Sequence, residues 1–206
     1  MAEKQFYNSY ILFTCIFITA INVSNASEDW LNHGGNILNR AYADSETKIS
    51  PQTATTLSLG RRFYAGKDIS ATPAIYNDTV YFSSWNGNMY AVKASDGSLV
   101  SQKNLQELTG LNTTILHSNV STIVSRATPT IADDKLIVGI RGPAVVIAME
   151  RATGNLIRST RLEDYFSNII TISDTNYNGG ADGALVVSVQ KSGFAWALYR
   201  DNGSLI

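Results

Sequence analysis

A motif that occurs three times is the feature that most constrains how this chain can fold. The first two copies open with Ala-Thr-Pro, and all three carry X-Gly turns at matching places. The copies cover residues 71–97, 127–154 and 184–203. Internal similarity on this scale predicts a repeat architecture, in which each unit buries its apolar face against the next unit.

Each copy predicts a strand, a tight glycine turn, a second strand, a second glycine turn and a third strand. Asn-Gly and Asp-Gly pairs supply the positive φ that two-residue hairpins need. The strands are nearly continuous apolar runs, such as Leu136–Ile140, which is typical of sheets covered on both faces. A small residue recurs at one repeat position, where it lets neighbouring sheets approach closely: Ala91, Ala148 and Ala197.

These features predict an all-β fold of four-stranded sheets stacked face to face around an axis, a partial β-propeller of about three blades. A β-sandwich of hairpins also fits short strands with turn signals, and stays open as an alternative. Residues 104–125 separate the first two copies. They are long for a structureless loop, and we expect a short helix there.

The N-terminal segment predicts export. Residues 11–23 are largely apolar, too short a run to cross a bilayer as a helix, and small residues follow at Ser24 and Ala26. We therefore expect a signal peptide at residues 1–26, a mature chain of residues 27–206 starting near Ser27, and a secreted product. A membrane anchor is the alternative. The only cysteine, Cys15, lies in this segment, so the mature chain would hold no disulfide or thiolate.

The charge of the chain bears on its partners, and its sequons bear on glycosylation. The net charge is −1, which gives no electrostatic footprint for nucleic acid. Arg61-Arg62 is the only paired basic spot and is interpreted as a solvated loop. Asn-X-Ser/Thr sequons, which are candidate glycosylation sites in a secreted chain, start at Asn77, Asn112, Asn119 and Asn202.

Residues 80–97 resemble the repeat of pyrroloquinoline quinone (PQQ) dehydrogenases. Residues 30–36 with Arg40, residues 49–59 and the Ala-Thr-Pro at 71–73 fit the lead-in to that repeat, and residues 191–203 are the most specific piece. Together they resemble the polyvinyl-alcohol-dehydrogenase-like branch, including its secreted plant members. The resemblance implies an eight-bladed propeller that holds PQQ over a metal ion, calcium, and oxidises alcohols or polyols.

Several departures from that family lead us to expect a catalytically incompetent fragment. The family has a long stretch, with its catalytic aspartate and part of the metal site, where this chain has only residues 163–190. No mature cysteine can lie against the quinone. The blade-closing tryptophan of the family is replaced by Ser101 in the first copy and Arg158 in the second. We therefore assign no catalytic and no metal-binding residue.

Three residues are candidates for binding PQQ. Lys191 matches the family lysine that reaches the quinone oxygens, where a cation would stabilise developing negative charge; an exposed turn lysine is the alternative. Arg126 and Thr128 open a blade, where the innermost strand faces the channel. Arg126 could pair with a PQQ carboxylate, or instead bridge two blades.

The Gly-rich stretch from Asp174 to Asp182 resembles the start of a calcium loop, with oxygen ligands at alternate positions. Leu185 stands where a bidentate glutamate belongs, so a polar hairpin turn is the preferred interpretation.

Two functions from different classes follow. The first is a relative of PQQ-dependent alcohol dehydrogenases, complete only with further blades. The second is a non-enzymatic secreted propeller with a binding role. An open stack leaves blade faces uncovered, so we also expect marginal stability and self-association through those faces.

Overall fold

The computed structural model of this chain describes residues 29–35, 40–43, 46, 48–111, 123–141, 144–162, 170–174, 184–189, 195–199 and 201–205. The predicted signal peptide at residues 1–26 lies outside these residues. Within the described ranges, no helix is both long and apolar enough to cross a membrane.

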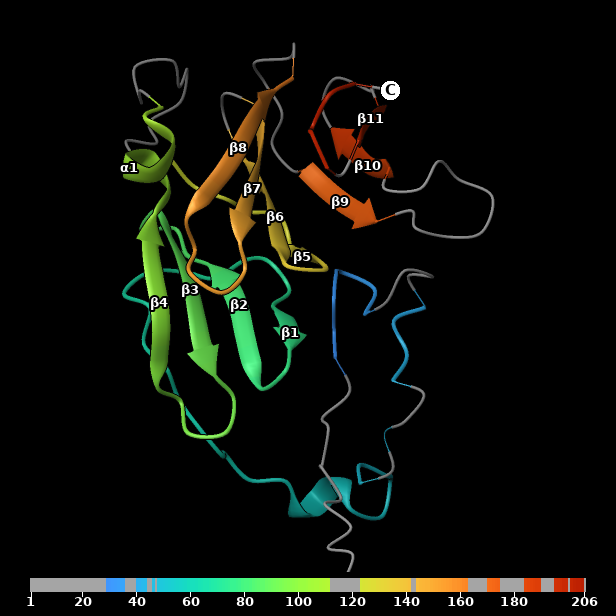
Figure 1. Ribbon diagram of the computed structural model, residues 1–206. Helices are drawn as coiled ribbons and strands as arrows, with labels where there is room; N and C mark the ends of the chain where they lie inside the picture. The colour runs from blue at the N-terminus through green and yellow to red at the C-terminus, as the bar shows by residue number, and fades with distance from the viewer. Residues whose placement is uncertain are drawn as a thin grey trace, which may run out of the picture.

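Two four-stranded antiparallel meanders form the first two copies (Figure 1). The first sheet has the strand order β1 (Ala74–Tyr76), β2 (Thr79–Ser83), β3 (Asn88–Lys93) and β4 (Leu99–Asn104). The second has the order β5 (Thr130–Ala132), β6 (Lys135–Ile140), β7 (Val145–Glu150) and β8 (Leu156–Arg161). The prediction of an all-β partial propeller is confirmed.

The third copy is a three-stranded antiparallel sheet. Its order is β11 (Ala195–Tyr199), β10 (Ala184–Val189) and β9 (Ile170–Asp174). Two short helices complete the described elements, namely the 3-10 helix η1 (Ala54–Thr56) and the helix α1 (Leu105–Thr109). The expected short helix between the first two copies is therefore confirmed as α1.

The first strand expected in each of the first two copies is in fact a hairpin of two strands. Its turn lies at Asn77-Asp78 in the first sheet, where φ is 44° and 61°, and at Asp133-Asp134 in the second, where Asp133 has a φ of 53°. Asn and Asp tolerate this left-handed region better than other non-glycine residues. The turn was missed because it contains no glycine.

The sheets stack face to face, and a separate apolar cluster fills each seam. Between the first and second sheets, Tyr81, Met89 and Ala91 pack with Val138 and Ile147. The opposite face of the second sheet meets the third sheet in another cluster, made mainly of Ala127, Ile137, Ala148, Leu162 and Leu198. Strands β6 and β7 are buried on both faces, as their continuous apolar runs predict.

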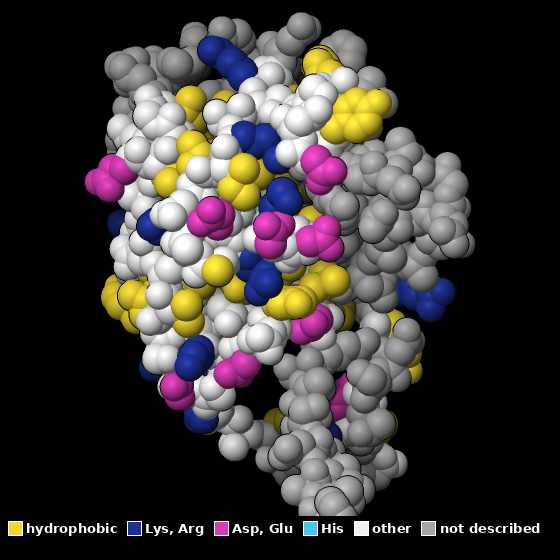
Figure 2. All heavy atoms as spheres, in the orientation of Figure 1, with side chains coloured by type: hydrophobic (Ala, Val, Ile, Leu, Met, Phe, Trp, Pro, Cys, Tyr) yellow, Lys and Arg dark blue, Asp and Glu magenta, His cyan; other side chains and the backbone are white. Residues whose placement is uncertain are grey.

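The outer face of the first sheet is covered by the chain segment that precedes it. Phe63 packs edge-on against Phe82 and Tyr90, with ring centroids 5.9 and 5.5 Å apart. The hydroxyl of Tyr90 donates a hydrogen bond to the carbonyl of Ala65 over 3.2 Å. Acidic and basic side chains are interspersed on the face of the described residues that Figure 2 presents, consistent with the near-neutral charge.

A short N-terminal segment lies along the inner edges of two sheets. Trp30 exchanges backbone hydrogen bonds with Ile75 of β1 over 2.8 and 2.7 Å. The next carbonyl, that of Leu31, accepts from the amide of Ile131 in β5 over 2.8 Å. The segment therefore ties the innermost strands of the first two sheets together.

Replacing Ile147 by alanine should destabilise the fold severely. Ile147 lies fully buried in the first seam, so the cavity would lower the free energy of unfolding by about 3 kcal/mol. Urea unfolding of the full chain measures this. Ile157→Ala on β8, where the side chain is 41% exposed, is the matched control and should change the free energy by less than about 1 kcal/mol. Equal losses for the two variants would contradict the stacked arrangement.

Candidate functional site

A tryptophan of the first sheet lies at the end of that sheet where its inner strand, β1, begins. Trp85 lies in the turn between β2 and β3, where its backbone amide donates to the carbonyl of Asp68 over 2.9 Å. The indole Nε1 donates to Oγ of Ser70, also over 2.9 Å. These two hydrogen bonds hold the ring at the sheet end with 37% of the residue exposed.

The second sheet contributes an arginine to the same end. Arg126 precedes β5, and its guanidinium carbon lies 3.6 Å from the centroid of the Trp85 ring. This is the geometry of a cation–π contact. Arg126 therefore bridges two blades, which is one of the two roles that the sequence suggested for it.

The electrostatics of this contact favour an anionic ligand. Nε of Arg126 is buried and has no hydrogen-bond partner among the described residues. Burial lowers the pKa of Arg126, and the nearby charge of Arg141 lowers it further. The backbone of Arg141 is fixed here because its amide donates to the carbonyl of Val124 over 2.9 Å. A carboxylate bound to the exposed part of the guanidinium would offset the repulsion between the two cationic groups.

Residues next to Arg126 in the chain contribute or contact hydroxyl groups. Oγ of Ser83, at the end of β2, donates to the carbonyl of Ser125 over 3.0 Å. Thr128 follows two residues after Arg126 and is buried. In the segment just before β1, the hydroxyl of Thr72 lies 3.4 Å from Nδ1 of His33. The seam thus combines positive charge, an aromatic face and small polar groups.

The predicted site residues divide into two groups. Arg126 and Thr128 lie on one segment at this end of the second sheet. Lys191 lies outside the described residues, as does most of the stretch from Asp174 to Asp182. In the described part of the chain, no three His, Cys, Asp or Glu residues form a cluster that could hold a metal ion.

Sequence reasoning did not assign Trp85 or Arg141 to the site. The repeat pattern could have identified them, because both residues belong to the middle turn of their copy. Trp85 follows Ser84 after β2, and Arg141 follows β6. The repeat therefore places an aromatic ring and a cation at equivalent positions of adjacent blades.

A similar contact joins the two sheets at their opposite end. The guanidinium carbon of Arg151 lies 4.1 Å from the centroid of the Tyr76 ring. Here, however, Nε donates to the carbonyl of Asp133 over 3.1 Å. Arg151 is therefore a structural counterpart of Arg126 at the other end of the sheets, with its Nε already hydrogen-bonded.

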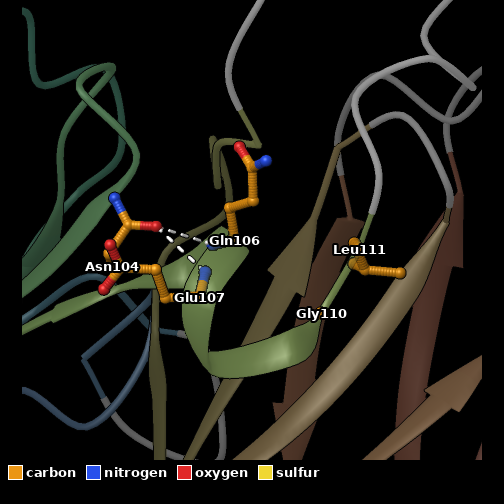
Figure 3. Close-up of a pocket in the computed structure, with 5 residues that line it drawn as sticks. All are labelled: Asn104, Gln106, Glu107, Gly110 and Leu111. Atoms are coloured by element: carbon orange, nitrogen blue, oxygen red, sulfur yellow. Dashed lines mark hydrogen bonds between the residues drawn. The ribbon is translucent and has the colours of Figure 1, made fainter.

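An open pocket of about 690 Å³ lies beside α1 (Figure 3). It is lined by Asn104, Gln106, Glu107, Gly110 and Leu111. Oδ1 of Asn104 accepts from the amides of Gln106 and Glu107 over 3.0 and 3.1 Å, so it caps α1. None of the predicted site residues lines this pocket.

Comparison with solved structures shows the fold. A quinohemoprotein alcohol dehydrogenase from Pseudomonas putida HK5 aligns with a TM-score of 0.63 and 19% identity over 86% of this chain and 26% of its own. A europium-containing methanol dehydrogenase aligns with a TM-score of 0.60 and 18% identity over 87% of this chain and 31% of its own. The quinohemoprotein alcohol dehydrogenase from Comamonas testosteroni aligns with a TM-score of 0.57 and 18% identity over 88% of this chain and 27% of its own. The chain thus spans less than a third of the length of each of these enzymes.

No curated protein matches the chain. A family model does match, over residues 45–160, which include the first two blades and more than half of the chain. Its description is outer membrane protein assembly factor BamB. The resemblance to PQQ-type propellers is confirmed at the level of the repeat and the fold. The chain belongs to the PQQ-repeat family that carries this description.

Proposed function

We propose that this chain forms part of the PQQ site of an alcohol oxidoreductase, and that its own role is to bind and orient the cofactor. The observation that carries the proposal is the guanidinium of Arg126 over the Trp85 ring, with the positive charge of Arg141 nearby. PQQ is a planar polycarboxylate. A guanidinium group beside an indole suits such a ligand, because it can bind carboxylate while the apolar ring excludes water.

The roles of the individual residues follow from their contacts. Arg126 would hold a carboxylate with its charge, and Arg141 would add positive potential from the adjacent turn. Ser70 keeps the Trp85 ring in position through its hydrogen bond to the indole. Thr128 would offer a hydroxyl from the same segment, and Lys191 would provide a further cation. When bound, PQQ would supply the acceptor for the hydride of the alcohol.

The finer assignment rests on the sequence. Residues 191–203 support the polyvinyl-alcohol-dehydrogenase-like branch and hence a small alcohol or polyol as the substrate. By the same resemblance a calcium ion would accompany PQQ. Because residues 163–190 are too few for the stretch that holds the catalytic aspartate in that family, we propose that the chain binds PQQ without oxidising alcohol by itself.

Titration with PQQ tests the proposed site through tryptophan fluorescence. PQQ should quench Trp85, and Arg126→Ala should weaken its binding about tenfold or more, because the cation that would pair with a carboxylate is lost. Arg126→Lys should restore part of the affinity. Arg151→Ala, which removes the counterpart contact at the other end of the sheets, is the control and should bind as the wild type does. Equal affinity of Arg126→Ala and the wild type would show that Arg126 does not contribute to PQQ binding. The absence of binding to any variant would favour the alternative, a non-enzymatic binding propeller.

We also propose that the protein is exported and glycosylated. Asn77 and Asn202 are exposed turn residues, whereas Asn112 and Asn119 lie outside the described residues. The two exposed sites could accept a glycan without disturbing a seam.

Expression in a eukaryotic secretory host tests export and glycosylation together. The medium should contain a chain that begins near Ser27, and peptide N-glycosidase should reduce its mass. Asn77→Gln and Asn202→Gln should each remove one glycan, because each destroys one exposed sequon. A product that stays in the cell and retains Met1 would contradict export.

A further inference from the structure

Each of the three repeat copies has a turn that contains a glycine. A basic side chain contacts each turn, and it comes from the outer strand or segment that precedes that copy in the stack. Each turn follows the third strand of its copy, and the glycine amide donates to the carbonyl four residues earlier over 2.7 to 2.9 Å. All three glycines have positive φ, between 71° and 77°. They are Gly97, Gly154 and Gly203.

The first contact joins the segment before β1 to the first sheet. Nε of Arg61 donates to the carbonyl of Ser95 over 2.6 Å, and its Nη2 contacts the same oxygen. The side-chain stem of Arg61 lies under Gly97, where a Cβ atom would be 3.7 Å from Cδ. Arg61 is therefore not part of a purely solvated basic pair, as its sequence context had suggested.

The third contact repeats this arrangement between the second and third sheets. Nη1 of Arg158 on β8 donates to the carbonyl of Asp201 over 2.8 Å, and the hydroxyl of Thr160 donates to the carbonyl of Gly203 over 2.9 Å. A Cβ atom on Gly203 would lie 2.5 Å from Nε of Arg158. In both contacts the arginine binds the carbonyl two residues before the glycine.

The two arginines hold the same position in the repeat. Four residues after Arg61 and Arg158 come Ala65 and Leu162, and each of these is buried in an apolar cluster. Position 158 is also where the family resemblance leads one to expect a tryptophan. At this joint an arginine thus takes the place of the expected aromatic ring.

The second contact uses a lysine instead. Ser101 occupies the equivalent position on β4 and is too short to reach the next blade. Lys103, two residues further on, lies under Gly154, where a Cβ atom would be 2.9 Å from its Cγ. Its Nζ donates to Oδ1 of Asn155 over 3.3 Å.

We propose that basic side chains join each sheet of this chain to the strand or segment that precedes it in the stack, by binding the glycine turn of that sheet. The stem of the cation packs beneath the glycine, and its donors bind polar oxygens of the turn, so the turn must present a residue without a side chain. Charge-assisted hydrogen bonds make the joint directional, since the cation always comes from the strand or segment that precedes the glycine turn in the stack. The joints lie at the opposite end of the sheets from Trp85 and Arg126, so they are independent of the proposed cofactor site.

Substitutions of the two joint arginines, Arg158 and Arg61, test the proposal in the full chain, with the neighbouring Arg62 as the control. Arg158→Leu keeps an apolar stem but loses the donors, and should lower the urea midpoint by about 0.5 M. Arg61→Leu should lower it less, because Arg61 is exposed. Arg62→Leu, which removes an equal charge beside Arg61, should leave the midpoint unchanged. Arg158→Lys should recover at least half of the loss, as Lys103 shows that a lysine can form such a joint.

A glycine pair supplies a second measurement if Arg158→Leu does not fold. Gly203→Ala and Gly97→Ala both place alanine at positive φ, but only at position 203 would the Cβ atom meet a guanidinium nitrogen and a hydroxyl closer than 3 Å. Gly203→Ala should therefore lower the midpoint clearly more than Gly97→Ala does. Equal midpoints for this pair, or for Arg158→Leu and Arg62→Leu, would overturn the proposal.

Discussion

The burial of the second sheet on both of its faces is the interaction on which the rest of this structure depends. Strands β6 and β7 place alternate side chains in two different seams, so Ile147 faces the first sheet while Ala148 faces the third. In the first sheet, by contrast, β1 and β2 are only partly buried. Because burial of apolar area is the main favourable term in folding, the middle sheet organises the whole stack.

This stacking also creates the candidate site. No single blade holds it, because the tryptophan comes from the first sheet and the arginine from the second. The hydrogen bond between Ser83 and the carbonyl of Ser125, and the N-terminal segment along β1 and β5, fix the two sheets at that end. A rotation of one sheet against the other would separate Arg126 from Trp85. The geometry of the site is therefore a property of the seam.

The sequence predicted those parts of the fold that are encoded locally. Continuous apolar runs predicted coverage of both sheet faces, and the glycine turns between β3 and β4 and between β7 and β8 lie where the repeat placed them. The hairpin turn at Asn77-Asp78 was missed because its positive φ values are adopted by residues other than glycine. The partners of the contacts between blades were missed for a different reason: Arg126 meets Trp85, and Arg158 meets the carbonyl of Asp201, across distances along the chain that no local pattern encodes. Of the three predicted cofactor residues, Arg126 and Thr128 lie together, whereas Lys191 lies outside the described residues.

Methyl-labelled methionine offers the most direct measurement of the stacked sheets. Apart from Met1, the chain has only Met89 on β3 and Met149 on β7, and both belong to the seam between the first two sheets. In the full chain, the methyl group of Met89 should show nuclear Overhauser contacts to isoleucine and valine methyl groups of β6 and β7. If Met89 showed contacts only within its own sheet, the two sheets would not pack face to face, and this account of the fold and of the site would be wrong.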